Sequence, residues 1–378
     1  MTLPSQRDLF DIPDDVAYLN CSYMGPLPRS TTRVGMEAVG RKSRPWGIQP
    51  GDFFEDSERV RTLFADLIGG DAEGVAIIPS VSYGMAVATL NVPVSAGKNI
   101  IVLAEQFPSN VYPWRELASS TGGNLVTVPR PADNDWTNAV LDLIDEKTAV
   151  VAIPNCHWTD GSLVDLVRVG EAARSVGAAF VVDGIQSLGA YPMDVSAVRP
   201  DFLVASSYKW LLGPYGLGFM WVSEDYREGR PVEHNWINRR GSEDFSTLVD
   251  YRDDFQPGAR RYDMGERSNP ILLPMALESL RQILDWGVEN ISEYTGSLTD
   301  LISQRAADMG IETVQKERRV RHMIGLRLGS KTPDDLATQL AARNISVSVR
   351  GESVRVSPHL YNTEKDVDHL FAALEEIL

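Results

Sequence analysis

The sequence predicts an α/β protein built around a mainly parallel sheet. Short apolar runs recur between residues 75 and 222 with almost no polar alternation, which is typical of strands covered on both faces. Amphipathic stretches separate several of the runs, and strands that alternate with helices imply crossover connections and a parallel sheet. The runs are Val75–Pro79, Ile100–Ala104, Leu125–Pro129, Ala149–Pro154, Ala179–Asp183, Phe202–Ser206 and Gly218–Val222.

The pattern changes after residue 270 and predicts a smaller α+β domain. We expect a large domain at 25–269 and a small domain made of 1–24 with 270–378. Residues 224–268 are polar and rich in charge, and long ordered excursions of this kind are often functional. The elements expected in the small domain are helices Pro274–Trp286 and Ile291–Met309, strand Met323–Leu328, helix Pro333–Arg343, strands Ser346–Val349 and Ser353–Ser357, and helix Glu364–Leu378.

Composition narrows the classes of partner. The net charge of −16 would repel phosphate backbones, so we do not expect nucleic acid. The stretch Leu203–Val222 is apolar but carries Lys209 near its middle, which disfavours a membrane span. The two cysteines, Cys21 and Cys156, give no disulfide framework, and Met1–Asp15 has no apolar signal region. We therefore expect a cytoplasmic protein, and no residue is assigned to a metal.

Three polar sites follow strands of the predicted sheet, where ligands of parallel sheets bind. Ser80 and Ser82 begin a helix and could form an anion site, although a plain serine cap is the alternative. Asp183 ends an apolar strand, where a desolvated carboxylate needs a cationic partner. The alternative is a helix cap or a buried structural ion pair. Lys209 lies in an apolar context that would favour a neutral amine, unless it is a surface turn residue. Together they match the phosphate site, the carboxylate and the aldehyde-binding lysine that pyridoxal phosphate needs.

Longer segments carry a resemblance to a known family. They are 181–186 (VVDGIQ), 206–218 (SSYKWLLGPYGLG) and 355–363 (RVSPHLYNT). In these segments the chain resembles class V aminotransferases of pyridoxal-phosphate fold type I, a group that includes cysteine desulfurases, isopenicillin N epimerase and, more distantly, kynureninase. The resemblance extends from Tyr18 to Leu378. It implies a large domain with a seven-stranded, mainly parallel sheet and a small C-terminal α+β domain.

The resemblance also implies roles for the residues around the cofactor. Lys209 would form the Schiff base and move the Cα proton, Asp183 would pair with the pyridine nitrogen, and Gln186 would contact the phenolic oxygen. Phe107 would stack on the pyridine ring, and Trp158 would lie near the phenolic oxygen. The phosphate contacts would come from Ser80, Val81, Ser82, Ser206 and Tyr208.

Two further residues would bind the substrate, an amino acid. Asn20 matches an N-terminal substrate loop, and Arg355 matches the residue that binds the substrate carboxylate, for which a guanidinium has the right fork geometry. Relatives are homodimers with the cofactor near the subunit interface, so we expect a homodimer. The resemblance thus predicts both the ligand class and the assembly.

The sequence departs from the family pattern at three places. Cysteine desulfurases carry a catalytic cysteine shortly before the matching arginine, whereas residues 344–356 contain none, so a persulfide relay is not expected. Tyr208 stands where desulfurases have histidine. Glu266 replaces a threonine that reaches the neighbouring subunit's phosphate, a contact that Arg267 or Ser268 could supply. We expect Glu266 to turn toward Arg260, Arg261 or Arg267.

The expected reaction starts with removal of the Cα proton by Lys209. Transamination is the working choice, and the alternatives are a lyase for C–S or other β- or γ-elimination, or an epimerase. A non-enzymatic regulator that binds the cofactor is a further alternative, although no DNA-binding region is appended. A nicotinamide dehydrogenase is disfavoured because no glycine fingerprint follows a strand. Shared residues around the cofactor do not separate the reactions.

Overall fold

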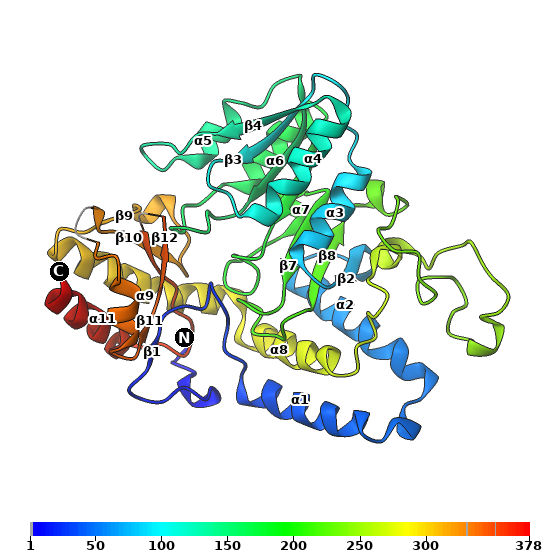
Figure 1. Ribbon diagram of the computed structural model, residues 1–378, viewed down its shortest axis with the longest axis horizontal. Coiled ribbons are helices and arrows are strands. Elements are labelled where there is room, and N and C mark those ends of the chain that lie inside the picture. Colours follow the sequence, from blue (N-terminus) through cyan, green and yellow to red (C-terminus); the bar gives the residue numbers. More distant parts are fainter. Residues whose placement is uncertain (1–2, 330–331, 352) are drawn as a thin grey trace.

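A seven-stranded sheet forms the centre of the computed structural model, which describes residues 3–329, 332–351 and 353–378 (Figure 1). The strand order is β2-β8-β7-β6-β5-β3-β4, and β8 runs in the direction opposite to the other six strands. All seven predicted strands are confirmed. Their bounds are β2 (Val75–Ile78), β3 (Asn99–Leu103), β4 (Asn124–Val128), β5 (Thr148–Pro154), β6 (Ala179–Asp183), β7 (Phe202–Ser206) and β8 (Gly218–Val222).

Each face of this sheet has its own apolar core. Successive strand residues point to opposite faces. In β3, for example, Ile101 and Leu103 lie in one core, while Ile100 and Val102 lie in the other. The helices α2 (Glu55–Ile68), α5 (Trp136–Leu141), α6 (Leu166–Ser175), α7 (Val195–Val198) and α8 (Leu272–Trp286) supply the first core, and α3 (Val81–Asn91) and α4 (Tyr112–Thr121) supply the second. This two-sided cover explains why the runs lack polar alternation.

A second, antiparallel sheet lies at one end of the molecule (Figure 1). Its order is β12-β13-β10-β9, and its apolar face packs on α9 (Val288–Asp308) and α11 (Glu364–Ile377). The N-terminal β1 (Ala17–Tyr18) pairs with β11 (Ile345–Ser346) beside it. The other bounds are β9 (Glu312–Thr313), β10 (Ile324–Arg327), β12 (Ser348–Arg350), β13 (Ser353–Val356), α10 (Leu336–Ala341) and α1 (Arg29–Lys42), which packs on α8.

The small sheet differs in detail from the expected elements. The strand predicted at Ser346–Val349 is divided, because β11 pairs with β1 while β12 pairs with β13. The helix predicted at Pro333–Arg343 is shorter, at Leu336–Ala341. The domain boundaries at 24/25 and 269/270 stay a prediction. Within the described residues, no helix combines the length and the apolar character needed to cross a membrane.

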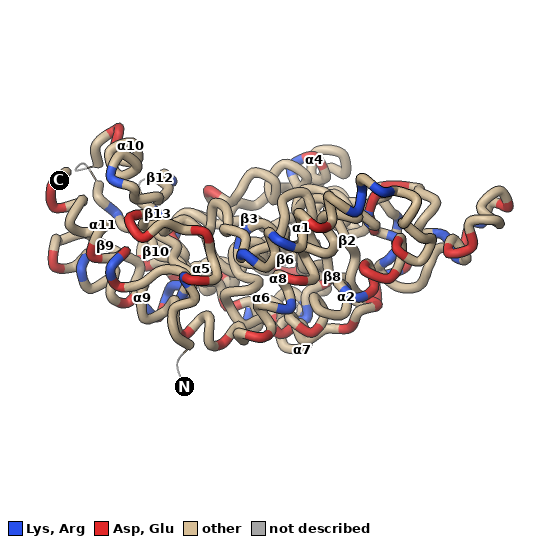
Figure 2. The backbone as a smooth tube through the Cα atoms, turned by 90° about the horizontal axis from the view of Figure 1, so that it is seen from below, with Lys and Arg blue, Asp and Glu red and all other residues tan. Residues whose placement is uncertain are grey.

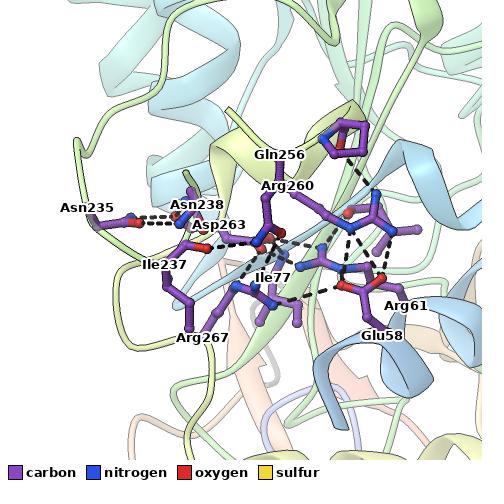
Figure 3. A network of polar contacts seen from close by, with 12 residues as sticks. Glu58, Arg61, Ile77, Asn235, Ile237, Asn238, Gln256, Arg260, Asp263 and Arg267 are labelled. Carbon is purple, nitrogen blue, oxygen red and sulfur yellow. Dashed lines mark hydrogen bonds and ion pairs between the residues drawn. The ribbon is translucent and has the colours of Figure 1, made fainter. Parts of the chain in front are cut away.

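The excursion at residues 224–268 projects from the end of the molecule opposite the small sheet, and the side view agrees (Figures 1 and 2). Its base is fixed by a buried ionic network (Figure 3). Asp263 is fully buried and pairs with Arg61 of α2 and, at 3.2 Å, with Arg267. Its carboxylate also accepts the backbone N–H of Ile77 in β2 at 2.7 Å. The network therefore joins the excursion to the edge strand and to α2.

We predict that the substitution Asp263→Asn will strongly destabilise the fold. It leaves Arg61 and Arg267 buried without their shared counter-charge, and breaking a buried ion pair typically costs about 3–5 kcal/mol. The free energy of unfolding in urea should fall by about that amount. The control is Arg59→Ala, which removes an exposed pair with Asp56 on the same helix and should cost under about 1 kcal/mol. Equal stability of the two variants would contradict this role.

Candidate active site

The predicted site residues meet at one edge of the central sheet. β6 and β7 are parallel, and β2 runs in the same direction because β8 is antiparallel to both β2 and β7. The carboxyl ends of these strands therefore lie together: Asp183 is the last residue of β6, while Ser80 and Lys209 lie just beyond β2 and β7. The register places Ser206 and Ile78 on either side of Gly218. The sequence-based expectation that these sites converge thus agrees with the strand directions.

Lys209 lies on the turn after β7 with its side chain almost wholly buried. Its Nζ is 5.7 Å from the ring centroid of Phe107 and 5.7 Å from that of Tyr208. The N–H of Gly25 donates to the Tyr208 carbonyl at 2.9 Å. A Cβ at Gly25 would lie 2.1 Å from the Lys209 oxygen, so only glycine allows this close approach. The N-terminal segment therefore fixes the lysine turn, a contact that sequence reasoning missed.

Burial perturbs the lysine and the nearby aspartate in opposite directions. Burial lowers the pKa of Lys209 to about 8, and the positive charge of Arg355 adds to this effect. Burial raises the pKa of Asp183 to about 6, while a backbone hydrogen bond from Ile185 and the charge of Lys209 oppose the rise. Each charged form is disfavoured by the apolar surroundings and supported by its neighbour. The amine is therefore partly neutral near pH 8, as a nucleophile requires.

The side chain of Gln186 is held by partners that the sequence did not indicate. Its Oε1 accepts from the Trp210 indole at 3.0 Å, and its Nε2 donates to the Ser22 carbonyl at 3.2 Å. Its backbone carbonyl lies 2.6 Å from Nε2 of the buried His322. An amide nitrogen has two N–H donors, so one remains for a ligand. Trp210 follows Lys209 directly and so links the lysine turn to Gln186.

The residues expected at the phosphate lie at the start of α3 and at the end of β7. Ser80 caps α3 by accepting the N–H of Tyr83 at 3.2 Å, and its hydroxyl lies 2.9 Å from that of Ser82. Both the serine cap and the anion site fit this arrangement, because the first N–H groups of a helix lack partners within it. Val81 begins the helix, while Ser206 ends β7 and is buried.

Two aromatic rings form one wall of the site. Phe107 and Trp158 meet edge to face, with centroids 5.4 Å apart. Phe107 is 39% exposed, which argues against simple core packing and leaves its face open to a flat ligand. The Trp158 indole donates to the Glu105 carbonyl at 2.6 Å. The structure therefore places Phe107 close to both Trp158 and Lys209.

The two residues expected at the substrate lie on the side of the small sheet. Arg355 is 2% exposed, and its Nη1 donates to the Trp158 carbonyl at 2.7 Å. Its Nε is buried without a hydrogen-bond partner, and burial lowers the pKa of Arg355 to about 9. Asn20 accepts a hydrogen bond from the Ser348 hydroxyl at 2.9 Å. A guanidinium with unused donors beside the lysine suits a carboxylate.

Two further expectations concern Glu266 and the two cysteines. Glu266 is exposed, but the structure gives it no ion pair with the expected arginines: Arg260 pairs with Glu58, and Arg267 pairs with Asp263. Other carboxylates already neutralise Arg260 and Arg267, while Nη1 of Arg261 donates to the Gly229 carbonyl at 3.2 Å, so Glu266 pairs with none of the three. Cys21 and Cys156 are free and buried, and burial raises the pKa of each thiol to about 12.

The buried amine, the carboxylate and the free helix N–H groups fit pyridoxal phosphate. The amine would bind the aldehyde, Asp183 the ring nitrogen, and the start of α3 the phosphate. Similarity to known proteins agrees with this fit. The family model for class-V aminotransferases matches residues 49–370. An uncharacterized aminotransferase of Bacillus subtilis (strain 168), YcbU, is 25% identical over 85% of this chain and 83% of its own length.

Other similar proteins cleave carbon–sulfur bonds, according to their names. The cysteine desulfurase of Escherichia coli O8 (strain IAI1) is 26% identical over 91% of this chain and 87% of its own. The cystine C–S lyase C-DES, solved with its product cysteine persulfide, superposes with a TM-score of 0.88 at 16% identity, over 96% of this chain and 98% of that chain.

These relatives correct the expected class of reaction. The expectation that set cysteine desulfurases aside is wrong, and assignment to the transferases in particular is not supported. That expectation rested on the missing cysteine of residues 344–356. One thiol on a loop is a local change, whereas the similarity to cysteine desulfurases extends over 91% and 97% of this chain. The family match confirms the resemblance seen in the sequence, and with it pyridoxal phosphate as the cofactor. The chain belongs to the class-V aminotransferase family.

Proposed function

We propose that the protein is a lyase that breaks the carbon–sulfur bond of cysteine or of a cysteine derivative. The observation that carries the proposal is the buried Lys209 amine of lowered pKa, which faces the Phe107 ring and has Asp183 and Arg355 as charged neighbours. The names of the relatives support the bond that is broken, because a cysteine desulfurase and a cystine C–S lyase share the family or the fold.

In this proposal the strand ends hold the cofactor. Lys209 attaches it covalently, Asp183 pairs with its ring nitrogen, and Gln186 uses its remaining N–H on the phenolic oxygen, near Trp158. Phe107 covers one face of the ring. When bound, pyridoxal phosphate accepts the electron pair that deprotonation leaves on Cα. The phosphate is held by Ser80, Val81, Ser82, Ser206 and Tyr208.

The chain's own side chains then carry the proton and orient the substrate. Arg355 and Asn20 hold the α-carboxylate, and Lys209 takes the Cα proton. The Cβ–S bond breaks, and the sulfur leaves with its electron pair and gains a proton. Addition of water to the three-carbon remainder gives pyruvate and ammonia, so that substrate and water together become thiol, pyruvate and ammonia.

The test is a product assay on holo-protein with L-cysteine and L-cystine. We expect sulfide or persulfide to appear in step with pyruvate, and a Lys209→Ala variant to release neither. Release of alanine together with sulfur would show that the C–S bond is still the bond that breaks, but by desulfuration. Transfer of the amino group to an added keto acid, with no sulfur released from either substrate, would refute the proposal.

We predict that uptake of the cofactor will follow the lowered pKa of Lys209. The amine is charged below about pH 8 and neutral above it, and only the neutral form attacks the aldehyde. When pyridoxal phosphate is added to apo-protein, the rate at which the visible absorption band appears should rise with a midpoint near pH 8. Arg355→Leu removes a positive charge and should move the midpoint to higher pH, whereas Arg343→Leu should not. A wild-type midpoint near the ordinary value of 10.5 would contradict this.

We further propose a cytoplasmic homodimer, for which exposed apolar side chains on α1 and after it give support. Met36 and Val39 lie on one face of α1 and are 71% and 55% exposed, and Trp46 is 79% exposed. Two free thiols suit a reducing compartment. Sedimentation equilibrium of holo-protein should give twice 41.7 kDa, and the double substitution Met36→Glu with Val39→Glu should give monomers. A monomeric wild type at micromolar concentration would refute the dimer.

A further inference from the structure

One face of the small sheet turns its polar side chains toward the site. Directly paired residues of antiparallel strands point to the same face. Ser348 pairs with Arg355, and Arg350 pairs with Ser353, so all four share a face. Val354, between Ser353 and Arg355, lies in the apolar core on the other side. The face toward the site therefore carries two arginines on neighbouring strands.

A third arginine on this face differs from these two. Arg327 pairs with Ser353 on the other side of β13, and its guanidinium contacts the Asp160 carboxylate at 3.3 Å and donates to Oδ1 of the Asn134 side chain at 2.8 Å. Among the residues that the structure describes, no carboxylate lies within ion-pair distance of Arg350 or Arg355. Their positive charges are thus not neutralised by the described part of the chain.

Both unneutralised arginines contact the same ring in the wall of the site. The guanidinium carbon of Arg350 lies 5.8 Å from the Trp158 ring centroid, and that of Arg355 lies 5.9 Å from it. Both charges also act on the lysine: after burial and Arg355, Arg350 contributes to the lowered pKa of Lys209. Arg350 therefore lies at the site, although it is only half-buried and its Nη1 donates merely to its neighbour's carbonyl, that of Val349.

A substrate with a single carboxylate would neutralise only one of these two arginines and leave the other without a counter-charge. Arg355 would take the α-carboxylate, and the cofactor's phosphate would lie at the start of α3 rather than at Arg350. We propose that Arg350 determines specificity by binding a second carboxylate, carried by the substrate beyond its sulfur atom. The preferred substrates are then cysteine derivatives with an acidic group on the sulfur side, an inference that rests on the proposed C–S lyase function. Such a group comes either from a thioether acid or from the far half of a disulfide such as cystine.

The experiment compares substrates that differ only in that charge. S-Carboxymethyl-L-cysteine and S-carbamoylmethyl-L-cysteine have the same shape, but only the first carries the second carboxylate. For holo-protein we expect kcat/KM to favour the acid by about tenfold to a hundredfold, the range for one charge-assisted bidentate contact. Arg350→Gln should bring the ratio close to one, and Arg350→Lys should retain part of it because the charge stays without the fork.

The matched control is Arg343→Gln. Arg343 follows α10 in the same part of the chain and pairs with Glu376, so the variant loses an equal charge away from the Trp158 ring. It should keep the wild-type ratio. A second pair, L-cystine and S-methylthio-L-cysteine, distinguishes the source of the carboxylate: a preference limited to cystine identifies the disulfide, and one limited to the first pair identifies the thioether acid.

A binding measurement separates this inference from the proposed function. Calorimetry of holo-protein with glutarate and with glutaramate compares a second carboxylate with a neutral amide, without any bond cleavage. Tighter binding of glutarate that Arg350→Gln abolishes supports the arginine site even if no sulfur compound is cleaved. If sulfur is released but neither the kinetic ratios nor calorimetry show a preference for the acid, the function stands and the role of Arg350 is refuted.

Discussion

The site depends on two opposite charges that are kept out of water at the ends of neighbouring parallel strands. Asp183 is the last residue of β6 and Lys209 lies on the turn after β7, and each would be costly to bury alone. Much of the surrounding structure serves to hold this pair in place. Gly25 anchors the lysine turn through its N–H, and Trp210 joins that turn to Gln186. The two apolar cores of the sheet supply the low polarity that shifts both pKa values toward the neutral forms.

The loop after β5 connects this centre to the small sheet. The Asp160 carboxylate accepts hydrogen bonds from Arg130 near β4 and from Arg327 of β10, at 2.7 and 3.3 Å. Its backbone carbonyl accepts the N–H of Gly325 at 3.1 Å. Trp158, two residues earlier, meets both Phe107 and Arg355. The same loop thus sets the distance between the ring wall of the cofactor site and the arginines of the small sheet.

Sequence predicted the parts of this arrangement that local pattern controls. The seven strands follow from their apolar runs, and the grouping of Ser80, Asp183 and Lys209 follows from strand direction. The two-residue strands β1 and β9 carry no periodic signal, and their pairing depends on distant chain segments. The contacts of His322 with Gln186, and of Asp263 with its arginines, likewise arise only from tertiary packing. The error about cysteine desulfurases came from giving one absent side chain more weight than the shared framework.

The pairing of β1 with β11 affects the order in which contacts can form during folding. β1 pairs with β11, and the N–H of Cys21 donates to the Ser357 carbonyl at 3.1 Å, so these contacts join segments that lie far apart in the sequence. Contacts of such long sequence separation form late, because the chain between them must be ordered first. Gly25, which secures the lysine turn, belongs to the N-terminal segment that follows β1. The central sheet can therefore form before these contacts, whereas the lysine turn reaches its final form only once the N-terminal segment has docked against it.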